Sequence, residues 1–123
     1  MAQASAAGPQ REQHAVVEMR TTFSRREDAL ACAERLVQGR LAACVQVDGP
    51  VTSVYRWQGE VESATEFRCT CKTSPARAAD CAAAIRALHE YETPELIVTE
   101  TGAAAAYAAW VRACVESEPR GGE

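Results

Sequence analysis

The sequence predicts a single α+β domain with a ferredoxin-like fold, in which a βαββαβ unit builds an antiparallel sheet and one further helix follows. Four stretches have strand character and three have the spacing of amphipathic helices, in the order strand, helix, strand, strand, helix, strand, helix. Right-handed crossovers then place the first two helices on the same face of the sheet. With 123 residues, the chain accommodates one such domain and not two.

The first strand and the first helix are predicted within residues 14–39. Apolar and polar side chains alternate over 14–22, which is typical of a half-buried strand. Ser24 and Glu27 then form a capping-box pattern, apolar residues recur at helical spacing, and Gly39 supplies a stop signal. We therefore expect the helix to be capped by Ser24 and to end at Gly39.

The next two strands are predicted to form a hairpin. An apolar run over 41–47 is followed by a kink at Gly49-Pro50, and strand character resumes over 51–57. Gly59 accommodates a positive φ, so a tight turn is expected there before the chain returns.

The returning strand ends in residues 66–72, where polar and apolar side chains alternate cleanly. Phe67, Cys69 and Cys71 face one way, and the two thiols on that face lie about 7 Å apart. Two interpretations stay open at this point. The thiols either bind Cu(I) or belong, with Phe67, to the core or to a trimer interior.

The second half of the chain repeats the pattern. Ser74 and Pro75 are expected to be the N-cap and the first residue of a second helix. Pro94 separates this helix from a last strand over 95–101, and an Ala-rich helix closes the domain. Two helices on one face leave the other face bare, and we expect that bare face to be apolar and to drive self-association.

Domain limits follow from composition. We expect a disordered leader over 1–13, where no apolar rhythm offsets the entropy of ordering, one domain over 14–116, and a polar tail over 117–123. No apolar stretch approaches the roughly 20 residues of a membrane helix, and no secretion signal is recognisable. We therefore expect a cytoplasmic protein without a membrane partner, with six free thiols: Cys32, Cys44, Cys69, Cys71, Cys81 and Cys114.

The charge excludes one class of partner. The chain carries 13 basic and 17 acidic residues, a net charge of -4, and the two signs are interspersed. A nucleic-acid surface normally requires a basic face that displaces counterions. We expect no nucleic-acid partner.

Several separated motifs resemble the CutA family of divalent-cation tolerance proteins. The resemblance extends over about residues 15–115, and an aromatic pair in the closing helix also matches. The motifs are Leu41-Ala42-Ala43-Cys44-Val45, Ser53-Val54-Tyr55-Arg56-Trp57-Gln58-Gly59, Glu66, Lys72-Thr73 and His89-Glu90-Tyr91-Glu92-Thr93-Pro94-Glu95.

The resemblance implies a tight homotrimer of ferredoxin-like subunits packed sheet to sheet, with a likeness to the PII-type nitrogen-signalling proteins. No catalytic activity is established for the family. Its members are linked to tolerance of divalent metals, chiefly copper. Cu2+ or another divalent cation is therefore the expected cofactor, although none is obligatory.

Two residues are candidate metal ligands, His89 and Cys44. Imidazole is a common ligand of borderline metals, and His89 stands in a polar loop near Tyr91, Glu92 and Glu95. The alternative for His89 is a hydrogen-bonded structural histidine at the end of the second helix. The alternative for Cys44, which lies in an apolar run, is a small buried hydrophobe.

The family resemblance also implies a ligand cleft between subunits that holds a small anionic or polar molecule. The alternative is a polar network that fixes trimer geometry, with Glu66 and Lys72 paired across neighbouring strands. The candidate cleft residues are Tyr55, Trp57, Glu66, Lys72, Tyr91 and Glu95.

The function that these observations favour is a trimeric copper or divalent-cation tolerance protein with weak metal binding at the inter-subunit cleft. The alternatives are a PII-like small-molecule sensor and a structural trimer that anchors a partner protein. We expect no enzymatic activity, because Cys44 lies in an apolar strand and a reactive thiolate paired with His89 requires exposure.

Overall fold

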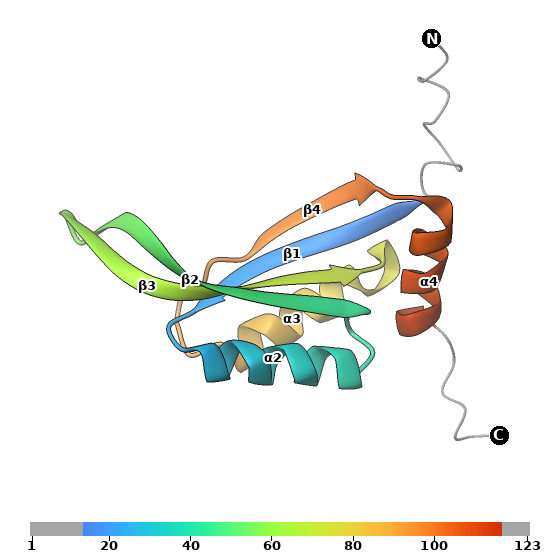
Figure 1. The fold of residues 1–123 in the computed structure, drawn as a ribbon, viewed down its shortest axis with the longest axis horizontal. Coiled ribbons are helices and arrows are strands. Elements are labelled where there is room, and N and C mark those ends of the chain that lie inside the picture. Colours follow the sequence, from blue (N-terminus) through green and yellow to red (C-terminus); the bar gives the residue numbers. More distant parts are fainter. Residues whose placement is uncertain (1–13, 117–123) are drawn as a thin grey trace, which may run out of the picture.

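A computed structural model of the protein describes residues 14–116. Its elements are β1 (Ala15–Phe23), α2 (Arg26–Gln38), β2 (Cys44–Trp57), β3 (Glu60–Thr73), the 3-10 turn η2 (Pro75–Arg77), α3 (Ala78–Leu88), β4 (Ile97–Gly102) and α4 (Ala105–Glu116). The strands form one antiparallel sheet in the order β2-β3-β1-β4. Figure 1 shows α2 and α3 on the same side of this sheet. The predicted ferredoxin-like fold is confirmed. The expected leader and tail lie outside the described residues.

The core lies between the sheet and these two helices. Val17, Met19 and Phe23 project from β1 toward the helices and pack with Leu36 of α2 and Ile85 of α3. All five side chains are at most 2% exposed. Burial of each contributes about 1.5–3 kcal/mol to stability, and this apolar face fixes which side of the sheet the helices cover.

One of the two expected helix N-caps is wrong. The residue before α2 is Arg25, in extended conformation and without a side-chain cap, while the Ser24 hydroxyl donates to Glu90 Oε2 at 3.0 Å. Ser74 is the N-cap of η2 and Pro75 its first residue, as expected, although the buried Ser74 hydroxyl makes no capping hydrogen bond. The end of α2 beside Gly39 is as expected. A tertiary contact therefore overrides the local capping signal at the start of α2.

The hairpin is longer and more continuous than expected. β2 runs unbroken past Gly49-Pro50, and the irregularity there is a bulge between Asp48 and Val51. Gln58 and Gly59 both have positive φ, so the expected tight turn is confirmed. We call residues 51–66 the arm, because this part of β2 and β3 projects beyond the rest of the sheet (Figure 1).

The sheet face away from α2 and α3 is polar, and the expectation of an apolar bare face is wrong. The register places Glu18, Lys72 and Cys44 side by side on it, and Arg20 and Arg68 lie further along the same face. Side-chain alternation explains the error. Most apolar side chains of these strands face the helices and pack in the core, so polar side chains are left on the opposite face.

The closing helix α4 covers one end of the sheet instead of a face (Figure 1). Its Ala108 and Val111 bury Val16 of β1 in a second small core. Within residues 14–116, none of the helices is long and apolar enough to cross a membrane.

The bulge generates a stability prediction. Gly49 has φ +144°, and a Cβ there would lie 2.8 Å from Phe67 Cδ2 and 3.0 Å from the Glu66 carbonyl oxygen. We expect Gly49→Ala to lower the free energy of unfolding by about 1–3 kcal/mol, measured by urea denaturation at fixed protein concentration. Gly102→Ala is the control, because its Cβ would meet no atom within 4 Å. Equal stability of the two variants would contradict this account of Gly49.

Candidate functional site

A cleft of about 870 Å³ lies between the arm and the segment that joins α3 to β4. Thr22 and Glu66 line it, and they alternate with Phe23 and Phe67, which pack with the core under the helices. The cleft is therefore on the side of the sheet that α2 and α3 do not cover. Its lining residues are Thr22, Ser53, Val54, Tyr55, Trp57, Glu62, Ala64, Glu66, Tyr91, Glu92, Thr93, Pro94 and Glu95.

The arm positions one wall through strand pairing. Tyr55 lies opposite Glu62 in the β2–β3 register, so both side chains share one face of the arm. The Ser53 hydroxyl donates to Glu66 Oε1 at 2.7 Å, which fixes that carboxylate. Trp57, two residues beyond Tyr55, extends the same face and is more than half exposed.

His89 positions the opposite wall. Its ring stacks on Phe23 with the centroids 4.2 Å apart, and Nε2 lies 2.7 Å from the Thr22 carbonyl oxygen. Since a carbonyl only accepts, Nε2 carries the proton, and Nδ1 accepts from the Tyr91 backbone N–H at 3.2 Å. Both ring nitrogens are thus engaged, and His89 places Tyr91 at the cleft.

This arrangement bears on the two candidate metal ligands. With both ring nitrogens hydrogen-bonded, His89 offers no lone pair to a metal in this conformation. Cys44 lies opposite Lys72, whereas Thr22, which His89 contacts, lies opposite Arg68. Lys72 and Arg68 are four residues apart on β3, which corresponds to roughly 13 Å along the strand. The structure therefore does not bring Cys44 and His89 together. Metal binding by either residue stays a prediction.

Lys72 is separate from the cleft within the protomer. Its Nζ donates to Gln46 Oε1 at 2.8 Å, while Glu66 pairs with Ser53. The alternative, a pairing of Glu66 with Lys72, is not formed within the protomer, because both lie on β3 six residues apart. The other five expected residues line this cleft within the protomer, and a cleft between subunits stays a prediction.

The cleft residues expected from the sequence did not include Glu62 and Glu92, although Glu92 was noted beside His89. The signal for Glu62 was present, because a hairpin that turns at Gly59 places it opposite Tyr55. With Glu66 and Glu95 these residues bring four carboxylates to the cleft. Among residues 14–116 no basic side chain lines the cleft, although Arg68 is close enough to Glu95 to interact with it.

The electrostatics of the cleft favour a cation. Burial raises the pKa of the Tyr91 phenol despite a hydrogen bond involving Ser24, and Glu66 is among the acidic groups that raise it further. Carboxylates and the faces of Tyr and Trp rings both attract cations. This lining favours a cationic ligand over the expected anionic one, and a small polar ligand in a cleft between subunits stays a prediction.

The family comparison agrees with this architecture. A model of the CutA1 divalent ion tolerance protein family matches residues 17–114. The divalent-cation tolerance protein CutA of Thermus thermophilus is 40% identical over 76 residues, which cover 62% of this chain and 74% of that protein. The chloroplastic CutA of Arabidopsis thaliana is 35% identical over 92 residues, 74% of this chain and 50% of that protein. The chain thus spans between half and three quarters of these relatives.

Solved structures give the same result. The crystal structure of CutA from Xylella fastidiosa has a TM-score of 0.79 at 30% identity and covers 82% of this chain and 98% of that one. The structure of CutA from Archaeoglobus fulgidus, described as periplasmic, has a TM-score of 0.78 at 30% identity and covers 82% of this chain and 99% of that one. Relatives are thus described from more than one compartment, and a cytoplasmic location for this chain stays a prediction.

The geometry around His89 generates a prediction. We expect His89→Ala to lower the free energy of unfolding by about 1–3 kcal/mol, because two hydrogen bonds and one ring stack are lost. Urea denaturation at fixed protein concentration measures the effect. His14→Ala is the matched control just before β1, with an expected change within about 0.5 kcal/mol. Unchanged stability of His89→Ala would contradict a positioning role.

Proposed function

Because the chain belongs to the CutA1 family of divalent ion tolerance proteins, we propose that it supports tolerance of divalent cations by binding them in its acidic cleft as a self-assembled trimer. The observation that carries the proposal is the lining itself, with four carboxylates and no basic side chain. The proposed role is binding and not catalysis, which the separation of Cys44 from His89 supports, because the two form no nucleophile–base pair.

Binding in the cleft is expected to be weak and reversible. Among residues 14–116, no three His, Cys, Asp or Glu side chains converge tightly enough to form a metal site. A cation there keeps part of its hydration and interacts with the carboxylates at longer range, as hard cations commonly do. Copper(II), with its affinity for oxygen and nitrogen ligands, is the proposed principal ion.

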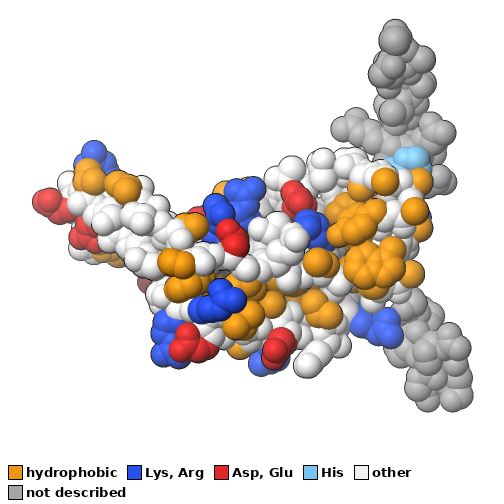
Figure 2. All heavy atoms as spheres, viewed as in Figure 1, with side chains coloured by type: hydrophobic (Ala, Val, Ile, Leu, Met, Phe, Trp, Pro, Cys, Tyr) orange, Lys and Arg blue, Asp and Glu red, His pale blue; other side chains and the backbone are white. Residues whose placement is uncertain are grey.

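Trimer formation is supported by where the exposed apolar residues lie. All six residues of β4 are exposed at the sheet edge, with Ile97 and Val98 among them. Val54, Trp57 and Val61 are exposed on the arm. Figure 2 shows hydrophobic side chains gathered over α4 and near the tip of the arm. An unpaired strand edge beside apolar surface favours association with further copies.

A second candidate function rests on the size of the cleft. About 870 Å³ exceeds the space that one ion requires and suits a small organic molecule. Tyr55, Trp57 and Tyr91 supply ring faces for an organic cation beside the carboxylates. This would make the protein a small-molecule sensor of the PII-like kind, for a cationic and not an anionic ligand.

The cleft proposal predicts a charge-dependent affinity. We expect the double variant Glu62→Gln/Glu66→Gln to bind Cu2+ about tenfold more weakly, because it removes two attracting charges. Isothermal titration measures the affinity. Gln keeps the size and an acceptor oxygen, so the Ser53 contact is preserved.

Three controls make that titration decisive. Glu34→Gln removes one carboxylate charge on the exposed side of α2, away from the cleft, and should bind as the native protein does. Loss of binding in His89→Ala but not in the cleft variant would place the metal on His89 and overturn the cleft proposal. Displacement of Cu2+ by a tetraalkylammonium ion, which has no lone pair with which to bind copper itself, would favour the organic-cation sensor.

Self-assembly is predicted to depend on the arm. Sedimentation of the native protein at micromolar concentration should give about 40 kDa, three times the 13.2 kDa of one chain. Val54→Glu/Val61→Glu should shift the population toward monomer, because two charges would enter an apolar contact. Val37→Glu, on an exposed position of α2, should leave the trimer intact. A dominant native monomer would contradict the proposal.

A further inference from the structure

Four of the six cysteines lie in one buried cluster on the helix side of the sheet. Cys32 comes from α2, Cys69 and Cys71 from β3, and Cys81 from α3. Each is at most 3% exposed. None of them lines the acidic cleft, so the proposed function gives these thiols no role.

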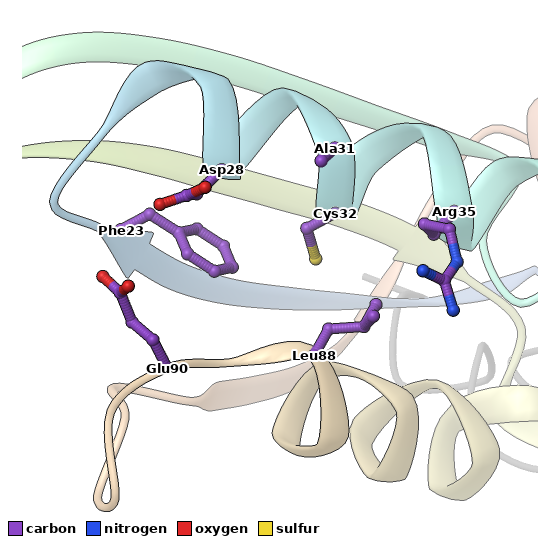
Figure 3. Close-up of a pocket in the computed structure, with 7 residues that line it drawn as sticks. All are labelled: Phe23, Asp28, Ala31, Cys32, Arg35, Leu88 and Glu90. Atoms are coloured by element: carbon purple, nitrogen blue, oxygen red, sulfur yellow. The ribbon is translucent and has the colours of Figure 1, made fainter.

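A groove of about 180 Å³ reaches this cluster between α2 and the end of α3. Figure 3 shows the Cys32 sulfur directed away from α2 toward the side of Leu88, with the Arg35 guanidinium further along the helix. Of the four clustered thiols, Cys32 is the one that lines the groove. An ion entering from solvent therefore meets Cys32 first.

Cys69 lies against α2 behind the groove. Its thiol donates to the Ala29 carbonyl oxygen, 3.4 Å away. Ala29 and Cys32 are three residues apart on α2 and both are buried, so they share the helix face that Cys69 contacts. Interaction with the Cys69 thiol lowers the pKa of Cys32 despite burial, and the Arg35 charge acts in the same direction. The same interaction, together with burial, raises the pKa of Cys69.

A buried hydroxyl beside Cys69 is an independent observation. Thr21 lies opposite Cys69 in the β1–β3 register, so the two side chains share the helix-covered face, about 5 Å apart. The Thr21 side chain is fully buried and its Oγ1 has no hydrogen-bond partner. An unpartnered buried hydroxyl costs about 1–3 kcal/mol. A thiolate on Cys69 would supply the missing acceptor.

We propose that Cys32 and Cys69 together bind one soft monovalent metal ion, copper(I) or silver(I), at the inner end of this groove. Soft thiolate ligands select copper(I), and two sulfurs suffice for such an ion. A structural zinc site requires four ligands, and within residues 14–116 no group of three metal-ligating side chains was found to converge.

The binding step balances in protons and charge. One monovalent ion replaces the protons of both thiols, so two S–H bonds break, two metal–sulfur bonds form and two protons leave to solvent. No oxidation or reduction of the protein takes part. The product carries one net negative charge, which the Arg35 guanidinium at the groove partly offsets and the Thr21 hydroxyl stabilises by donation.

The test is an anaerobic titration of the full-length reduced protein with copper(I) held by bicinchoninate, a chelator whose copper complex absorbs in the visible. We expect the protein to withdraw one copper(I) per chain, with native mass spectrometry confirming the stoichiometry. Cys32→Ser and Cys69→Ser should each weaken binding by at least about 100-fold, because loss of a direct ligand exceeds the 10- to 100-fold effect of outer-shell changes.

Matched variants decide the assignment. Cys114 lies outside the cluster and is not a candidate metal ligand, so Cys114→Ser should bind as the native protein does. If Cys69→Ser does not fold, as judged by circular dichroism, Cys32→Ser at the groove decides alone. Absence of binding in the native protein, or retention of binding in folded Cys32→Ser, would overturn the proposal. Loss of binding in Cys114→Ser would overturn it as well.

Discussion

The alternation of side chains along β3 is the constraint on which both faces of the sheet depend, the one covered by the helices and the one that carries the cleft. β3 is paired on both edges, to β1 and to β2, so its register cannot slip without exchanging the two faces. Phe67, Cys69 and Cys71 consequently pack under the helices, while Glu66 and Arg68 face the other way. A single strand therefore supplies two thiols to the buried cluster and two carboxylates to the cleft.

The fold was predictable because alternation and helical spacing are local signals that agree with the tertiary structure. The N-cap of α2 was not, because its outcome depends on a partner distant in sequence. The Ser24 hydroxyl reaches Glu90, 66 residues away, instead of its own helix. The polarity of the bare face was likewise misjudged. Only the full register shows that residues such as Glu18 and Lys72 share one surface.

The part of the candidate site on the arm was predictable from the sequence. The role of His89 was not, because it depends on hydrogen bonds that only the structure shows. A hairpin turning at Gly59 brings Tyr55, Trp57 and Glu66 to one face by alternation alone. The sequence also marked His89 as important, but only its contacts define the role, since both ring nitrogens are committed to the Thr22 and Tyr91 backbone. His89 thus serves to position Tyr91 at the cleft.

The sheet separates two environments of opposite chemical character. On one side, the cleft carboxylates, of which Glu62, Glu92 and Glu95 are exposed and Glu66 is half-buried, suit hard or borderline divalent cations held loosely. On the other, buried sulfur ligands suit a soft monovalent ion held directly. Because ligand hardness and burial differ on the two sides, the two proposed sites would take cations of different type without any contact between them. Alternation along one strand is sufficient to produce that division.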